Sequence, residues 1–194
     1  FLCRNVCRQE TQHEHGDEQY TAGHKISLVS SHFIRCYART NHKFQLRMLL
    51  GGLKMKTVQK LTLSDARIIM EAAEGKASEI GVDMDIAITD DNGSLLMFHR
   101  MDDGRITSID VAISKAFTAA AARKSTRAYG EVGGAGGPAF GIHVSNQGKF
   151  MIVAGGLPLF VKEQIVGGVG CSSGSPDQDE VVAQAGIDAF LSQL

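Results

Sequence analysis

The chain has 194 residues, of which 43% are hydrophobic and 21% charged, a composition typical of a soluble globular protein. Its net charge of −1, the absence of Trp and the low aromatic content argue against a nucleic-acid partner. No run approaches the roughly 18 consecutive apolar residues of a membrane span, so no membrane association is expected. Only one of the four cysteines lies beyond residue 36, so no disulfide framework is predicted, which fits a reducing cytoplasm.

Residues 1–54 and 55–194 differ in character. The first segment has 8 Lys and Arg against 4 Asp and Glu, holds five of the seven histidines and shows no helical or alternating period. It is interpreted as an N-terminal extension that is non-functional or derived from cloning. A flexible arm and a metal-binding tail are the alternatives, although the spacing of Cys3 and Cys7 with the nearby histidines is loose for zinc. Residues 55–194 are expected to form one domain.

The domain is predicted to begin with a helix over 62–81, because Thr62 and Asp65 have the spacing of a capping box. Strands are predicted over 84–89 and 94–100, joined by an Asp-Asp-Asn-Gly turn. Asn-Gly favours a tight hairpin because both residues tolerate positive φ.

A second helix is predicted from Thr107 or Ser108, followed by strands, and a last helix from Ser175. The four further strands are expected at 139–145, 149–154, 158–162 and 164–170. Several strand pairs are joined by turns too short for a parallel crossover. The sequence therefore predicts an α+β fold with a mainly antiparallel, five- to six-stranded sheet covered by helices.

Two glycine clusters flank the predicted hairpin over 139–154, namely Gly136-Gly137-Pro138 and Gly155-Gly156. Glycine permits positive φ and close approach to backbone, so the clusters suggest a shaped surface for a ligand. They are also typical of tight turns at the ends of short strands.

Two motifs near the C-terminus do not support the activities they resemble. Gly170-Cys171-Ser172-Ser173-Gly174 matches the nucleophile elbow of serine hydrolases, but no histidine follows His143. The glycines of the same stretch lack the βαβ context of a dinucleotide site. The free amides before Pro176 remain a candidate site for a carboxylate or phosphate.

His99 and His143 are the only histidines of the main domain, and His99 is followed by Arg100 and Met101. Imidazole and thioether groups are both ligands of haem iron. The alternative is that each histidine is an ordinary surface or core residue.

From Leu61 onward the chain resembles the GlcG/HbpS-like family, which includes the C-terminal domain of PduO-type proteins. The resemblance covers about residues 57–194 and consists of six collinear motifs. These are LTLSDA (Leu61–Ala66), IAITDDNGSLLMFHRMDD (Ile86–Asp103), SIDVAISKAFTAA (Ser108–Ala120), GGPAFGI (Gly136–Ile142), AGGLPLF (Ala154–Phe160) and GGVGCSSGSPDQDE (Gly167–Glu180). It implies a profilin-like fold, assembly into homo-oligomers from dimer to octamer, and binding of haem or a corrinoid.

The resemblance also implies a pocket for a small-molecule ligand. Arg100 and Lys115 would pair with carboxylates such as haem propionates. With the two histidines, the candidate binding residues are His99, Arg100, Met101, Lys115, Thr118, Gly136, Gly137, Pro138, His143, Gly155 and Gly156.

One departure from the family concerns iron. Some haem-binding members supply an axial histidine from the first helix, and residues 62–81 contain none. Ligation would fall to His99, Met101, His143 or a neighbouring subunit.

The sequence therefore predicts a homo-oligomeric binding protein for haem or another tetrapyrrole. The alternatives are an enzyme that degrades haem or acts on a small metabolite of glycolate, glycerol or propanediol pathways, and a ligand-free accessory protein. The residues nominate no catalytic mechanism.

Overall fold

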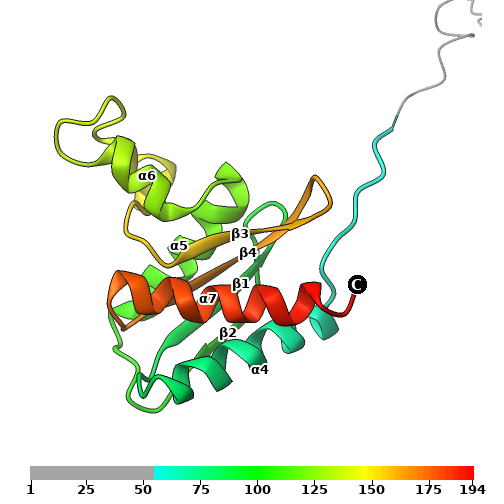
Figure 1. The fold of residues 1–194 in the computed structure, drawn as a ribbon. Coiled ribbons are helices and arrows are strands. Elements are labelled where there is room, and N and C mark those ends of the chain that lie inside the picture. Colours follow the sequence, from blue (N-terminus) through cyan, green and yellow to red (C-terminus); the bar gives the residue numbers. More distant parts are fainter. Residues whose placement is uncertain (1–54) are drawn as a thin grey trace, which may run out of the picture. The chain divides into compact units, whose positions relative to one another are not determined.

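A four-stranded antiparallel sheet lies at the centre of the part of the chain that the structure describes (Figure 1). The strand order is β2-β1-β4-β3, so β1 and β4 are central and β2 and β3 are edges. The strands are β1 (Asp85–Asp90), β2 (Leu95–Arg100), β3 (Gly156–Val161) and β4 (Gln164–Ser172).

The computed structural model describes residues 55–194, within which Thr57–Leu194 is a compact unit. The interpretation of residues 1–54 as an extension, and the zinc alternative, lie outside the described residues. Within 55–194, no helix is long and apolar enough to cross a membrane.

Helices cover both faces of the sheet (Figure 1). On one face, α4 (Leu63–Glu79) and α7 (Pro176–Leu191) pack against each other and against the strands, whereas α5 (Ser108–Ala122) lies on the other. The predicted capping box is present at the start of α4, and Ser175 and Gln178 form another at the start of α7. Thr107 precedes α5 but makes no side-chain capping bond.

The two faces of the central strands bury different residue types. Ile86, Ile88 and Val169 belong to the large core beneath α4 and α7. Toward α5, Cβ atoms at Gly168 and Gly170 would lie 2.5 and 2.2 Å from backbone oxygens of that helix. The glycine-rich stretch of β4 therefore lets α5 lie close against the sheet, a packing role.

The α+β class and the antiparallel sheet are confirmed, but the sheet has four strands instead of five to six. The segments 139–145 and 149–154 are not strands. The chain forms α6 (Thr126–Gly133) and then two short 3₁₀ helices, η1 (Ile142–Val144) and η2 (Asn146–Gly148). Within 139–145 backbone amides bond to carbonyls three residues earlier, as from Ile142 to Ala139 and from Ser145 to Ile142, instead of to a neighbouring strand.

Candidate functional site

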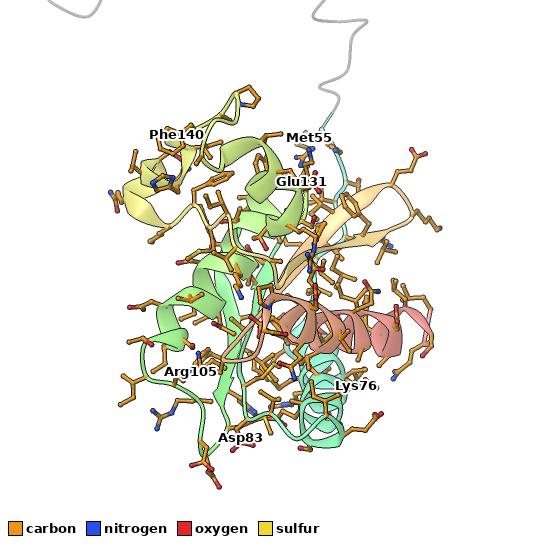
Figure 2. All side chains as sticks on the ribbon, turned by 60° about the vertical axis from the view of Figure 1, so that its left-hand side comes forward. Met55, Lys76, Asp83, Arg105, Glu131 and Phe140 are labelled. Carbon is orange, nitrogen blue, oxygen red and sulfur yellow. The ribbon has the colours of Figure 1, made fainter. Side chains whose placement is uncertain are left out.

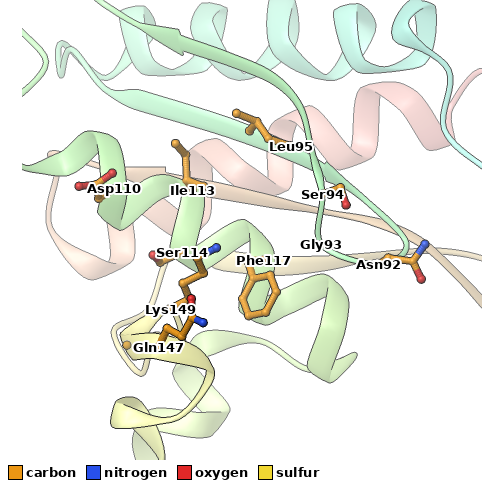
Figure 3. Close-up of a pocket in the computed structure, with 11 residues that line it drawn as sticks. Asn92, Gly93, Ser94, Leu95, Asp110, Ile113, Ser114, Phe117, Gln147 and Lys149 are labelled. Atoms are coloured by element: carbon orange, nitrogen blue, oxygen red, sulfur yellow. The ribbon is translucent and has the colours of Figure 1, made fainter.

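A groove of about 560 Å³ lies beside α5, between the β1–β2 hairpin and η2 (Figure 3). Leu95, Ile113 and Phe117 supply large apolar side chains, and Lys149 and Asp110 supply one charge of each sign. The remaining lining residues are small or uncharged: Asn92, Gly93, Ser94, Ser114, Gln147 and Gly148. The volume lies within the ~300–1,000 Å³ range of small-molecule sites.

Local sequence positions the apolar side of this groove. Ile113 and Phe117 are four residues apart on α5 and so share one face of the helix. Leu95 pairs with Thr89 at the start of β2, next to the hairpin turn. A Cβ at Gly93 would lie 2.6 Å from the Phe117 ring, and Gly93 has a φ of +84°. The turn glycine is therefore required both for backbone geometry and for the place of that ring.

The other side of the groove is tethered by Thr118. Its hydroxyl accepts a hydrogen bond from the Met151 amide at 2.8 Å and donates one to the Lys149 carbonyl at 3.3 Å. Thr118 is buried, so it does not line the groove. Thr118, a predicted binding residue, instead holds in place the segment around Lys149, which lines the groove.

Lys115 lies in a buried ion pair. Its Nζ is 2.6 Å from Oδ2 of Asp179 and 2.8 Å from the carbonyl oxygen of Cys171. The two charged side chains are 1% and 4% exposed. Burial raises the pKa of Asp179, and the Lys115 ammonium opposes the rise. The Lys115 ammonium is therefore engaged inside the protein, where no propionate reaches it.

Gly155 lies beside this ion pair, and Gly156 packs against the backbone of Lys115. Both glycines are buried, and Gly155 has a φ of +114°. A Cβ at Gly155 would lie 2.7 Å from Lys115 Nζ, and one at Gly156 would lie 2.6 Å from the Thr126 methyl group. The structure thus brings together three predicted residues, Lys115, Gly155 and Gly156, as a packing unit.

The amides at the start of α7 are satisfied internally. The Gly174 amide donates to Oδ1 of Asp179 at 3.0 Å, and the Ser175 amide donates to Oε1 of Gln178 at 2.9 Å. The anion site suggested there by the sequence is therefore filled by the chain's own side chains.

His99, Arg100 and Met101 are adjacent in sequence but point to different surroundings. His99 Nδ1 lies 2.6 Å from Oε1 of Glu74 on α4. Arg100 pairs in register with Asp85. The Met101 sulfur accepts a hydrogen bond from the Met84 amide at 3.3 Å. Arg100 faces away from the side that His99 and Met101 share, and each of the three has a different neighbour.

The remaining predicted residues lie in the segment after α6, and Figure 2 shows Phe140 of this segment on the opposite side of the described domain from Asp83. Gly136 and Pro138 are exposed there. A Cβ at Gly137 would meet the Val132 carbonyl oxygen at 2.2 Å. Nδ1 of His143 is buried and has no hydrogen-bond partner.

Sequence reasoning therefore missed the groove, whose lining includes none of the predicted site residues. Ile113 and Phe117 recur at helical spacing, a pattern that indicates the buried face of a helix as readily as a ligand site. Leu95 is 47% exposed, and that exposure is visible only in the fold.

Sequence reasoning also missed Asp85, a fully buried carboxylate on β1. Its Oδ2 accepts a hydrogen bond from the Ser173 hydroxyl at 2.8 Å, while its Oδ1 has no partner. Burial raises the pKa of Asp85, against the effects of Ser173 and the Arg100 charge.

Comparisons with known proteins agree with the motifs. A family model described as "Haem degrading protein HbpS-like" matches residues 61–188. An uncharacterized 15.0 kDa protein of Citrobacter freundii, from the dhaT-dhaS intergenic region, is 34% identical over 137 residues. The match covers 71% of this chain and 96% of that protein.

Two further relatives carry functional descriptions of their own. The corrinoid adenosyltransferase PduO of Salmonella typhimurium is 32% identical over 137 residues, which cover 71% of this chain but only 41% of PduO. A solved structure described as a PduOC:heme complex has a TM-score of 0.65 and 31% identity. That match covers 68% of this chain and 95% of the other.

Proposed function

This chain belongs to the HbpS-like family, and we propose that it binds haem or another tetrapyrrole as a homo-oligomer. The observation that carries the proposal is the relative solved as a haem complex, which is 31% identical to this chain over nearly all of its own length. The adenosyltransferase activity of PduO is not transferred, because the matched region spans less than half of that protein.

The groove beside α5 is the place we assign to the ligand. Leu95, Ile113 and Phe117 offer apolar contact to a porphyrin face, since tetrapyrroles are flat and largely apolar (Figure 3). Lys149 supplies a cation at the rim for a propionate. The lining therefore fits the ring and one carboxylate of haem.

Oligomer formation is supported by exposed apolar side chains elsewhere on the domain. Ile106, Phe140 and Val144 are 75%, 68% and 71% exposed. Phe140 and Val144 lie four residues apart in one segment, and exposed apolar side chains that group together are typical of interaction sites. Light scattering coupled to size exclusion tests this proposal, and a monomer at every concentration contradicts it. The cytoplasmic location inferred from the cysteines stays a prediction.

The description of the family names haem degradation, which favours an enzyme as the second candidate. Asp110 and Lys149 are the titratable side chains among the lining residues. Loss of the Soret band with release of one iron per haem would support this candidate, whereas a stable spectrum supports binding alone.

The test of binding is a hemin titration followed at the Soret band, with two matched variants. Leu95→Asp places a charge in the groove, and Val181→Asp places one on α7, where the side chain is 46% exposed against 47% for Leu95. We expect Leu95→Asp to raise the Kd at least tenfold, about 1.4 kcal/mol, because the ligand would desolvate the carboxylate. Val181→Asp should bind like the wild type. Absence of saturable binding to the wild type contradicts the function, and equal effects of the two variants contradict the location.

A further inference from the structure

We infer that the groove recognises the porphyrin ring and a carboxylate but not the iron, so that metal-free porphyrin binds as tightly as haem. This inference rests on the proposed function and specifies its ligand class. It follows from the chemistry of the lining and from where the predicted iron ligands and Cys171 lie.

The lining offers no usual axial ligand. Haem iron in proteins is held by His, Met, Cys or Tyr side chains. None of the described residues that line the groove is of these types. Its polar groups are the hydroxyls of two serines, two side-chain amides, the Asp110 carboxylate and the Lys149 ammonium.

His99 lies across the sheet from the groove. It pairs with Ile86, whose side chain is in the core beneath α4 and α7, and its Nδ1 contacts Glu74 of α4. Leu95 contributes to the groove on the α5 side of β2. Simple alternation would put Leu95 and His99, four residues apart, on one face, but the register shift between Ile88 and Thr89 changes this. Leu95 pairs with Thr89, whose hydroxyl bonds to α5, whereas His99 pairs with Ile86 on the α4 side.

Met101 and Cys171 are also removed from the groove. Met101 lies six residues beyond Leu95, about 20 Å along an extended chain, and its sulfur accepts a hydrogen bond from the Met84 amide. Cys171 is fully buried in the core, where burial raises the pKa of its thiol and disfavours the thiolate that binds metal.

His143 lies in η1, just before the η2 residues that line the groove. Its Nδ1 is buried within the protein, and its side chain is not part of the lining. The apolar lining of the groove is therefore formed without the His143 side chain.

The lining instead has what a porphyrin ring requires. Phe117 presents an aromatic side chain whose position the Gly93 turn defines, and Leu95 and Ile113 extend the apolar surface. Aromatic side chains of this kind contribute the largest apolar contact areas in binding sites. Lys149 is exposed, so it pairs with a carboxylate at the rim.

The experiment compares hemin with metal-free protoporphyrin IX on the full chain, by quenching of tyrosine emission and by absorbance. We expect Kd values that agree within about threefold, a difference below about 0.7 kcal/mol. The hemin complex should show a high-spin spectrum. Lys149→Gln should weaken both ligands equally, by about twofold to fivefold, as expected for a rim ion pair. His99→Ala and His143→Ala should leave both affinities and the spectrum unchanged.

Each of the other outcomes contradicts a stated part of the proposal. Hemin that binds more than about tenfold tighter than the metal-free ring overturns the inference while the haem-binding function stands. A low-spin spectrum that either histidine variant abolishes does the same. If neither porphyrin binds saturably, the proposed function and the inference fall together. If both bind but Leu95→Asp weakens neither, the groove is not the site, and the inference drawn from its lining is overturned.

Discussion

The ammonium of Lys115, on the helix that covers one face of the sheet, lies 2.6 Å from the carboxylate of Asp179, on a helix that covers the other. The contact passes the end of the sheet at Gly155, which lacks the Cβ that would obstruct it. The pair therefore links the two helical layers by a buried charge interaction. Two predictions concern this link.

Lys115→Met should destabilise the domain by about 3–5 kcal/mol, because it leaves the Asp179 carboxylate buried without its counter-ion. Urea unfolding followed by circular dichroism measures the change. The double variant Lys115→Met with Asp179→Leu is the control, and it should recover most of the loss because no buried charge remains. A double variant less stable than Lys115→Met would contradict this account.

Gly155→Ala should cost about 2–4 kcal/mol, because it adds a clash to the strain of positive φ. The new Cβ would lie 2.6 Å from Cβ of Asp179 and 2.7 Å from Lys115 Nζ. Gly136→Ala is the matched control, since Gly136 has a φ of +78° with nothing within 4 Å. It should cost only the backbone strain, about 1–2 kcal/mol. Equal losses of stability in thermal melts would show that the clash is unimportant.

The buried Asp85 carboxylate should make stability depend on pH. Because burial raises its pKa above the ordinary 3.8, the folded state holds this proton more tightly than the unfolded state. The contribution of Asp85 to stability is therefore greatest below the ordinary pKa and declines as pH rises through the raised folded value.

Unfolding free energies of the wild type and Asp85→Asn across the acidic and neutral range check this sign. The wild type should lose stability relative to the variant as pH rises. Asp179, whose pKa burial also raises, is present in both proteins, so its contribution cancels in the comparison. Parallel curves would contradict the prediction.

Cys171 should resist thiol reagents in the folded protein, because it is fully buried and burial raises its pKa. The measurement uses a chain in which Cys3, Cys7 and Cys36 are replaced by Ser, so that only this thiol reports. Labelling by iodoacetamide should proceed only as fast as the protein opens and should become rapid in urea. Ser64→Cys, at an exposed position on α4, provides a control that labels at once.

Local sequence determined much of the secondary structure, because its signals act over a few residues. The capping boxes at Thr62–Asp65 and Ser175–Gln178 and the hairpin turn appear where the spacing predicts them. In that turn Gly93 has positive φ but Asn92 does not, so the turn is not the primed type that Asn-Gly favours. The segments 139–145 and 149–154 were wrongly predicted to be strands, because short runs of apolar residues such as theirs are typical of strands. In the fold, several backbone amides of this segment bond instead to carbonyls three residues earlier.

The family was also readable from the sequence, through six collinear motifs that the family match over residues 61–188 confirms. The motifs did not reveal what each residue does. Lys115 reads as a cation for a ligand, and the fold places it against Asp179, 64 residues away.

The sequence by itself determined the elements, the class of fold and the kinship, since these depend on spacing along the chain. Only the tertiary structure decided which charges are buried in pairs and which apolar side chains stay open to a ligand. Burial depends on which distant segments meet, and Phe117 and Leu95 line a groove only because the hairpin, α5 and η2 come together there.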